Sequence, residues 1–155
     1  MAAPFDAEKA DNLQDIEKQF AVAVVEHMIA YEKLISSIPP SKIRLTKVDD
    51  MMLAHLVRDF PALVSPENDY AALRVLNEDE MKSVKGKEAW RNYVKEYENL
   101  VPDYNFGTLV RTDASGDYAQ ENTTLVLRAQ FFAIEIARNR FGLNDRFHEE
   151  AQKNN

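Results

Sequence analysis

The first long segment of the chain has the spacing of apolar residues that is typical of an amphipathic helix. Between residues 12 and 38, apolar residues recur mostly three or four positions apart, which places them on one helical face. They are Leu13, Ile16, Phe20, Val24, Tyr31, Leu34 and Ile38. A second apolar strip, formed by Val22, Val25 and Ile29, lies roughly opposite this face. We expect the strip to pack against another helix of the same domain, and the alternative is a docking strip for a partner.

Two further helices are predicted in the middle of the chain. Residues 48–60 form the first, and Pro61 ends it because proline cannot continue a helix. Its inward-facing residues are Met52, Leu53, Leu56, Val57 and Phe60. The second spans about residues 85–100, with a core face of Trp90, Val94, Tyr97 and Val101. Between them, "YAALRVL" (70–76) fits a helix or a strand, and Asn77 is placed to cap a turn with Glu80 reaching back to it.

The last predicted helix runs from Thr123 to Phe141 and is apolar around most of its circumference. Such a helix is buried on most sides, so we expect it to lie centrally in the fold. Gly142 stands where a helix commonly turns left-handed, and Leu143 can close the hydrophobic contact of that motif. Asn122 reads as the cap of this helix.

The predicted fold is therefore mainly α, with a single helical domain and at most one small strand pair. The strands would be "KIRLT" (42–46), which shows short alternation, and "GTLVR" (107–111), in which Leu109 and Val110 suggest a strand. We expect residues 1–11 to form a flexible N-terminus, residues 12–146 the helical domain, and residues 147–155 a polar, frayed C-terminal tail.

Composition fits one globular domain and narrows the possible chemistry. The chain has 155 residues, and 45% of them are hydrophobic. It has no cysteine, which removes disulfides, zinc thiolate sites and thiol catalysis, and fits a reducing compartment. We expect no secretory signal, because the N-terminus has no basic region followed by an apolar run, and no membrane span, because no apolar run approaches ~20 residues. The net charge of −7 argues against nucleic-acid binding, which usually needs a basic face.

The sequence shows no catalytic constellation, so it predicts no cofactor and no metal site. The four glycines lie too far apart to form a cofactor-binding loop, and the three histidines are not at metal-ligand spacing. The loop carboxylates Asp113, Asp117 and Glu121 lack the alternating spacing of a calcium loop.

The run "EIARNRFGLND" (135–145) contains more polar groups than a helix end requires. Arg138 and Arg140 suit the negative end of the helix dipole. Capping does not explain Asn139, Asn144 and Asp145, nor the choice of arginine over lysine. Arginine offers a planar fork of donors that suits carboxylates and backbone carbonyls, either inside the fold or in a partner. Both explanations remain open at this point.

Two runs, "DYNFGTLVRTDA" (103–114) and "AIEIARNRFGLND" (133–145), resemble signature runs of the polysaccharide biosynthesis domain-containing protein family. "FDAEKADN" (5–12) and "WRNYVKEYENLV" (90–101) match as well, so the resemblance extends from Phe5 to Asp145. The family grouping also takes in plant proteins of xylan synthesis that are linked to sugar methyl transfer. Small eukaryotic members look instead like dedicated chaperones, associated with the ribosome and with the nascent GTPase domain of translation elongation factor 1-alpha.

The resemblance implies a non-enzymatic, cytoplasmic chaperone whose partner is nascent elongation factor 1-alpha. We expect it to meet the ribosome mainly through this client, without contacting a membrane or binding nucleic acid directly. The alternatives are a sugar-modifying enzyme and a ribosome- or RNA-binding adaptor. A chaperone should present an apolar or mixed patch, whereas an enzyme should present a deep pocket with convergent polar groups.

We expect the two signature runs to converge into one client-binding surface. The turn Asn105–Gly107 would lie beside the C-terminal end of the last helix, with Phe106 as an apolar anchor. The residues of this predicted site are Asn105, Phe106, Gly107, Arg111, Arg138, Asn139, Arg140, Asn144 and Asp145. The competing structural account has the arginines bonded internally to Glu135, Asp103 or Asp145, which would lock the helix end.

Overall fold

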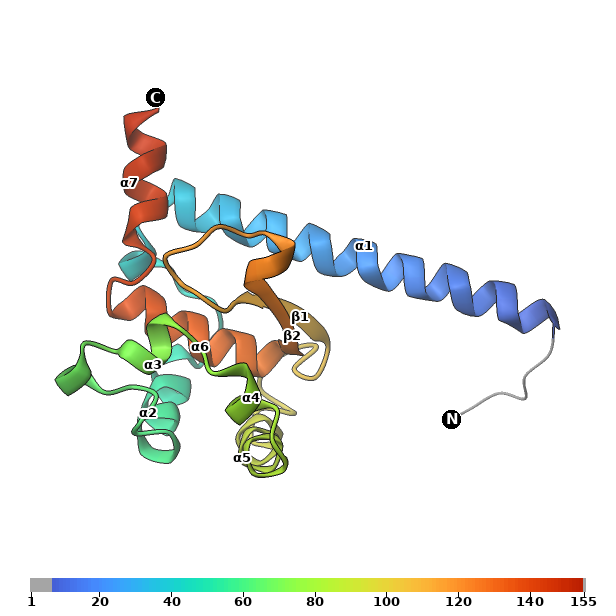
Figure 1. The fold of residues 1–155 in the computed structure, drawn as a ribbon, viewed down its shortest axis with the longest axis horizontal. Helices are drawn as coiled ribbons and strands as arrows, with labels where there is room; N and C mark the ends of the chain where they lie inside the picture. The colour runs from blue at the N-terminus through green and yellow to red at the C-terminus, as the bar shows by residue number, and fades with distance from the viewer. Residues whose placement is uncertain (1–6, 155) are drawn as a thin grey trace.

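Seven α-helices, three short 3-10 helices and one pair of strands are found in the part of the chain that the computed structural model describes, residues 7–154, with side chains from Lys18 on (Figure 1). The α-helices are α1 (Ala7–Ser37), α2 (Asp49–Asp59), α3 (Ala71–Arg74), α4 (Glu78–Met81), α5 (Val84–Lys95), α6 (Arg128–Arg140) and α7 (Asp145–Lys153). The strands β1 (Gly107–Arg111) and β2 (Thr123–Leu127) form an antiparallel hairpin. The predicted class, a single mainly α domain with one small strand pair, is confirmed.

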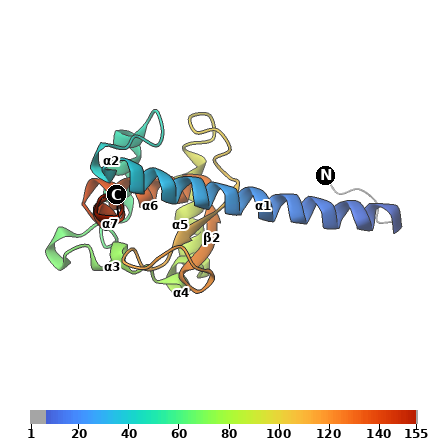
Figure 2. The ribbon, with the colours of Figure 1, turned by 90° about the horizontal axis from the view of Figure 1, so that it is seen from above.

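Helix α6 lies at the centre of the fold (Figures 1 and 2). It packs against α2, α3, α5 and both strands, and every residue but Phe132 from Ala129 to Asn139 is buried. The prediction of a central, buried last helix is therefore right. Its predicted start at Thr123 is wrong, because residues 123–127 form β2 instead. Their β-branched and apolar side chains alternate between the interior, as at Val126, and the surface, as at Leu125.

The strand "GTLVR" is correctly predicted, but its partner is not. Gly107 pairs with Leu127 and Arg111 with Thr123, so β1 pairs with β2. The predicted strand at residues 42–46 is wrong. The backbone N–H groups of Leu45 and Thr46 instead donate to the Asp49 carboxylate, at 2.8 and 2.6 Å. These bonds tie "KIRLT" to the start of α2 rather than to a sheet.

Asn122 does not cap a helix. Its side-chain oxygen accepts from the Thr112 hydroxyl at 2.9 Å and from the Asp113 N–H at 3.0 Å. Its amide group donates to the carbonyls of Asp113 and Asp117, both at 3.0 Å. The side chain therefore holds the loop between β1 and β2 in place.

Helix α1 lies across the domain with its C-terminal part, while its N-terminal part extends away from it (Figures 1 and 2). Val24, Tyr31 and Ile35 are buried against the domain, and the side chains of Leu13 and Ile16 lie outside the described ones. The second apolar strip is exposed, at 55% for Val22, 42% for Val25 and 58% for Ile29. The expectation that this strip packs on another helix is therefore wrong.

Both predicted chain ends differ from the structure. Helix α1 already begins at Ala7, within the segment expected to precede the helical domain, and residues 1–6 lie outside the described part. Residues 145–153 form α7, in which Phe147 is buried, instead of a frayed polar tail. The aromatic side chain of Phe147 explains the difference, because its burial anchors the helix to the domain.

The middle of the chain follows the predicted pattern closely. The predicted core face of the helix at residues 85–100 is entirely buried, although α5 ends at Lys95. In α2, Val57 is exposed, contrary to prediction. Asn77 caps α4 by accepting from the Glu80 N–H at 3.1 Å. "YAALRVL" forms the one-turn helix α3 and then a bridge from Val75 to Asp113. Across the described residues, no helix combines the length and apolar character needed to cross a bilayer.

Candidate functional site

The predicted client-binding residues lie at two opposite ends of α6. The turn at Asn105–Gly107 is beside the N-terminal end, because Gly107 pairs with Leu127, which directly precedes α6. There the Arg128 guanidinium lies 6.0 Å from the centre of the Phe106 ring. The other predicted residues gather at the C-terminal end, which a helix of 13 residues places about 20 Å away. The prediction of one composite surface is therefore wrong.

Arg111 and Arg138 belong to the interior of the protein. Both side chains are 0% exposed, as is that of Glu135 between them. Arg138 Nη1 lies 3.1 Å from one Glu135 carboxylate oxygen, and Arg111 Nη2 lies 3.5 Å from the other. Arg138 also donates to the carbonyls of Leu73 and Arg111, at 2.9 and 2.8 Å. In this fold neither arginine can touch a partner, and the internal role with Glu135 applies to both.

Asn139 and Asn144 are buried in the same network. Asn144 accepts from Arg111 and donates to Glu135 at 3.2 Å and to Asn139 at 2.7 Å. Asn139 in turn donates to the Tyr31 hydroxyl at 3.0 Å. We call Arg111, Glu135, Arg138, Asn139 and Asn144 the buried polar network. It connects β1, α6 and the loop before α7 with α1, and so accounts for the polar groups that capping left unexplained.

The electrostatics of the buried polar network favour the ionised form of Glu135. Burial by itself raises the pKa of Glu135, but Arg138 and Arg111 outweigh it, so this pKa lies below its usual value. The two guanidinium groups carry one charge more than Glu135 neutralises. Backbone carbonyls accept from both arginines, and Arg111 also lies 4.5 Å from the centre of the Phe147 ring. These partners stabilise the excess positive charge inside the protein.

The remaining predicted residues are accessible but do not form a site. Arg140 is exposed and forms an ion pair with Asp50 at 2.8 Å. Asp145 is partly buried at the start of α7, and no ion pair joins it to another described side chain. Asn105 and Phe106 are exposed at the far end of α6. A binding surface must therefore be sought elsewhere on the domain.

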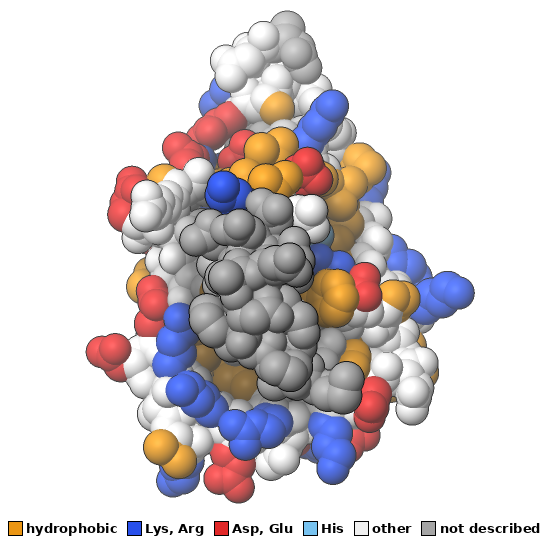
Figure 3. All heavy atoms as spheres, turned by 90° about the vertical axis from the view of Figure 1, so that its right-hand side faces the viewer, with side chains coloured by type: hydrophobic (Ala, Val, Ile, Leu, Met, Phe, Trp, Pro, Cys, Tyr) orange, Lys and Arg blue, Asp and Glu red, His pale blue; other side chains and the backbone are white. Residues whose placement is uncertain are grey.

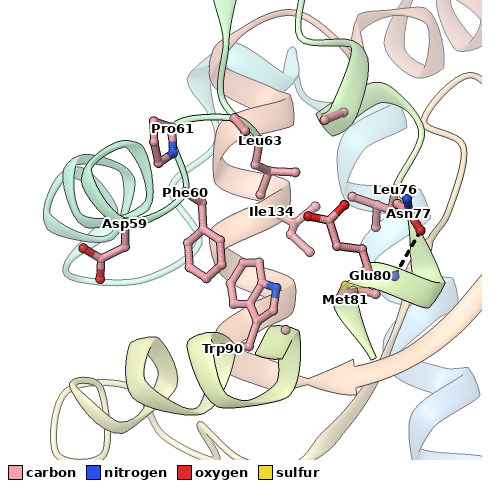
Figure 4. Close-up of a pocket in the computed structure, with 13 residues that line it drawn as sticks. Asp59, Phe60, Pro61, Leu63, Leu76, Asn77, Glu80, Met81, Trp90 and Ile134 are labelled. Atoms are coloured by element: carbon pink, nitrogen blue, oxygen red, sulfur yellow. Dashed lines mark hydrogen bonds between the residues drawn. The ribbon is translucent and has the colours of Figure 1, made fainter. Parts of the chain in front are cut away.

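A cavity of about 290 Å³ opens between α2, α4 and α5, and Ile134 of α6 forms part of its lining (Figure 4). We call it the apolar pocket. Its apolar lining includes Phe60, Leu63, Leu76, Met81, Trp90 and Ile134. Phe60 stacks on Trp90, with ring centres 4.2 Å apart and planes inclined by 20°. A cavity of this size and lining suits one or two apolar side chains, close to the lower limit of small-molecule sites.

Gly86 makes the apolar pocket possible by allowing α5 to approach α4 closely. A Cβ atom at this position would lie 2.1 Å from the carbonyl oxygen of Glu80 and 2.7 Å from that of Met81. Only glycine therefore fits without moving backbone atoms. This close approach places Trp90 of α5 and Met81 of α4 at the same cavity (Figure 4).

The polar side chains of the apolar pocket stand at its rim. Asp59 is bonded to Arg58 at 2.9 Å and to His55 at 2.8 Å, and the hydrogen bond from Arg58 lowers the pKa of Asp59 below its usual value. The Glu80 carboxylate reaches over the cavity in Figure 4 and forms no ion pair with the described residues. The rim therefore offers one negatively charged group for a partner. Among the described side chains, from Lys18 to Asn154, no cluster of His, Asp or Glu is arranged to hold a metal ion.

The sequence does not predict this pocket, because no local pattern indicates it. The periodicity identifies Phe60 and Trp90 only as core residues, and the lining residues are spread along the chain from Asp59 to Ile134. Only the packing of α2 and α5 on α6 brings these residues together. The acidic turn at Glu78–Glu80 was a local signal of charge, without indicating which cavity it would border.

Comparison with known proteins settles the family. A family model described as PBDC1 protein matches residues 16–149. The chain belongs to the PBDC1 family. The PBDC1 homolog of Saccharomyces cerevisiae is 50% identical over 141 residues, covering 91% of this chain and 94% of that protein. The homolog of Schizosaccharomyces pombe is 47% identical over 145 residues, with 94% and 96% covered. Human PBDC1 is 42% identical over 143 residues, with 92% of this chain and 58% of the human protein covered.

A solved structure agrees with the fold of this PBDC1 family member. The solution NMR structure of protein yst0336 from Saccharomyces cerevisiae superposes with a TM-score of 0.79 at 48% identity, covering 94% of this chain and 97% of that one. The family resemblance carried by the two signature runs is thereby confirmed. The names of these relatives state no substrate, partner or activity.

Proposed function

We propose that this PBDC1 family member is a non-enzymatic, cytoplasmic chaperone that binds the nascent GTPase domain of translation elongation factor 1-alpha at the ribosome and assists its folding. The client and the ribosome come from what the family resemblance implies for small eukaryotic members. The observation in the structure that supports a binding role is the apolar pocket, with apolar residues inside and charge only at its rim. Such exposed apolar surface is typical of sites that bind other proteins.

The apolar pocket would capture an apolar side chain that the client has not yet buried. Burying one leucine or phenylalanine side chain contributes about 1.5–3 kcal/mol, which is enough to hold a segment and weak enough to release it. Once the client's own core forms, the same side chain becomes buried there and leaves the pocket. Glu80 at the rim would favour a client segment with a Lys or Arg beside the apolar anchor.

Contact with the ribosome would run mainly through the client. The chain carries a net charge of −7, which disfavours close approach to ribosomal RNA. Strong binding to empty ribosomes that weakens steeply with added salt would contradict this part of the proposal and favour the RNA-binding alternative. The described residues contain a single two-stranded antiparallel sheet, and the four glycines lie too far apart to form a cofactor-binding loop, so no observation favours the sugar-modifying alternative.

The experiment is affinity isolation from cells with intact ribosomes, followed by sequencing of the co-purified nascent chains. Ala62 is exposed at the edge of the apolar pocket, and Ala62→Trp places an indole there. Ala54 on α2 is also exposed but does not line the pocket, so Ala54→Trp is the matched control. We expect the wild type and the control to enrich nascent elongation factor 1-alpha, and Ala62→Trp to lose most of it. Equal enrichment by all three proteins would contradict the role of the pocket, and no enrichment by any would contradict the proposed client.

A further inference from the structure

A second cavity, of about 310 Å³, lies between α5 and the hairpin. Its floor is formed by Leu125, Val126 and Leu127 of β2, and its rim by Lys82, Lys87 and Arg91. We call it the basic groove. It shares Trp90 and Met81 with the apolar pocket, so the two cavities lie on either side of these residues.

The charge of the basic groove is opposite to that of the whole chain. The sequence has 26 Asp and Glu residues against 19 Lys and Arg, yet no acidic residue lines this cavity. Lys87 and Arg91 are exposed one turn apart on α5, and neither forms an ion pair in the described part of the chain. Lys82 is already engaged, because it donates to the Thr124 hydroxyl and lies 3.8 Å from Glu78. Lys87 and Arg91 are therefore the cations available to a ligand.

Basic side chains also gather around apolar surface on the side of the domain from which α1 extends. In Figure 3 an orange hollow is visible there, with blue Lys and Arg side chains along its left and lower border. Leu125 is 47% exposed on the floor of the groove. A Cβ atom added at Gly107 would lie 2.8 Å from Phe20 and 3.2 Å from Leu125, so apolar surface continues from the groove towards α1.

The outer edge of β2 borders the basic groove. Side chains alternate along a strand, so three consecutive residues can line one cavity only if it runs along the strand edge. On its other side β2 pairs with β1, and β1 is packed against α1. Residues 124–126 form no backbone hydrogen bond besides those to β1 in the described structure. The Thr112 N–H donates to the Asn122 carbonyl, and the Arg111 carbonyl is turned away from β2 to Arg138, so in this register Thr124 and Val126 are bonded to β1. The N–H and C=O groups of Leu125, which is 47% exposed, therefore point outward and are a template for another strand.

We propose that the basic groove binds an extended, acidic segment of a protein partner, which adds as a third strand along the outer edge of β2. Its carboxylates would pair with Lys87 and Arg91, and an aliphatic side chain would pack on Leu125. Addition of a strand to a free sheet edge is an established way of binding peptides. This site goes beyond the proposed function. The apolar pocket, with Glu80 at its rim, favours a basic client segment, whereas the basic groove favours an acidic one.

The lining of the basic groove favours a peptide over a nucleic acid. Proteins that bind single strands without sequence preference combine a basic groove with exposed aromatic rings on which bases stack. Here the floor is aliphatic, and Trp90, the aromatic residue of the lining, is only 6% exposed. The phosphates of a nucleic acid could pair with Lys87 and Arg91, but its bases would have no exposed aromatic ring to stack on.

The test uses the purified full chain and a labelled synthetic peptide of about ten residues in which Glu alternates with Val, so that one face of the strand is acidic and the other apolar. Binding is followed by fluorescence anisotropy and by the backbone amide chemical shifts of the protein. We expect binding with the largest shifts at residues 124–127, and no binding of the same peptide with Lys in place of Glu. Because neither ribosome nor client is present, the outcome is independent of the proposed function.

A pair of double variants locates the site. Lys87→Glu with Arg91→Glu should weaken binding about tenfold or more, since two favourable pairs become repulsive. Lys85→Glu with Lys95→Glu makes the same charge change at exposed positions of α5 outside the groove and should change the affinity less than about twofold. Leu125→Glu, on the floor, should also weaken binding. Circular dichroism and thermal unfolding establish that each variant is folded.

Three results would overturn the proposal. Equal losses in the two double variants would show that the peptide responds to net charge and not to the groove. Amide shifts confined to other elements would exclude strand addition at β2. If oligouridylate binds with the predicted dependence on Lys87 and Arg91 while the acidic peptide does not, the groove is a nucleic-acid site instead.

Discussion

The C-terminal end of α6 and the surface around α5 place their polar groups in opposite ways. At the end of α6, the charged side chains of Arg111, Glu135 and Arg138 are completely buried and bonded to one another. Around α5, apolar side chains line two open cavities, and the charged groups stand at the rims. The first arrangement holds elements of the fold together, whereas the second leaves both apolar surface and charge available to a partner.

This contrast teaches that conspicuous residues are not always the binding residues. A buried ion pair forms only when nearly every donor and acceptor is satisfied, because taking charges out of water is costly. Such a network therefore requires particular residue types in a particular order, and it gives the sequence run 135–145 its unusual composition. A cavity for apolar side chains requires less of the sequence, because any of the common apolar core residues can line it.

The largest effect is expected from Arg138→Ala. The substitution leaves Glu135 with only Arg111 as a charged partner and removes the donors to the carbonyls of Leu73 and Arg111. Breaking a buried pair in this way costs about 3–5 kcal/mol of unfolding free energy, a large part of the stability of a domain. Urea unfolding measures the loss.

Arg140→Ala is the matched control, because this arginine forms an exposed ion pair with Asp50. Exposed pairs contribute little, so its effect should be far smaller than that of Arg138→Ala. Similar losses in the two variants would contradict the distinction between a buried network and a surface pair. A well-folded Arg138→Ala protein that loses only client binding would restore Arg138 as a binding residue.

Gly86→Ala tests how the apolar pocket is built. The added Cβ would meet backbone atoms of α4, with the nearest at 2.1 Å, so α4 and α5 must move apart. Overpacking of this kind costs about 1–3 kcal/mol, and it should change the environment of Trp90, which fluorescence reports. Gly107→Ala meets only the end of the Phe20 ring and the Leu125 side chain, at 2.8 and 3.2 Å. If Gly107→Ala proves the more damaging of the two, the role given to Gly86 in the apolar pocket is wrong.

The third prediction concerns the acid sensitivity of the buried polar network. The folded-state pKa of Glu135 is lowered, so ionisation of this group stabilises the fold above its unfolded-state pKa of about 4.3. This contribution is lost as the pH falls from there through the folded-state pKa, by at most about 1.4 kcal/mol per pH unit for one proton. Glu135→Gln cannot titrate, and it should be less stable than the wild type at neutral pH.

The stability difference between wild type and Glu135→Gln should therefore shrink below about pH 4.3. Comparing the two proteins removes the contribution of the surface carboxylates, which titrate in both. Chemical denaturation at a series of pH values from neutral downwards provides the measurement. A difference that stays constant throughout would mean that the pKa of Glu135 is the same in the folded and the unfolded protein, and a difference that grows as the pH falls would mean that folding raises it.

Local patterns were sufficient for those parts of the fold whose causes are local. The spacing of Trp90, Val94, Tyr97 and Val101 identified a core face, and all four are buried. Gly142 adopts a φ of 81°, and the Leu143 N–H donates to the Arg138 carbonyl at 2.9 Å, as the helix-ending motif requires.

Features that depend on distant partners could not be predicted in the same way. The run Leu125–Leu127 fits the beginning of an apolar helix as well as a strand, and its pairing with Gly107–Leu109 decides between them. Arg138 is buried because the carbonyl groups of Leu73 and Thr112 accept hydrogen bonds from it. The sequence alone does not show that these distant carbonyl groups lie beside Arg138. Both cavities arise only when α5 has packed beside α4 and the hairpin.

The smallest effect on stability is expected on α1, at the exposed apolar strip of Val22, Val25 and Ile29. Because the described part of the domain leaves these side chains largely in solvent, Val25→Gln with Ile29→Gln should change the unfolding free energy by no more than about 0.5 kcal/mol per site. Ile35→Ala, on the buried face of the same helix, should instead cost about 2–5 kcal/mol. Urea unfolding of the wild type, the double variant and Ile35→Ala at two protein concentrations makes the comparison.

A large loss of stability in the double variant that depends on protein concentration would show that a second copy of the chain covers the strip. A large loss that does not depend on concentration would show that the strip packs within the domain after all.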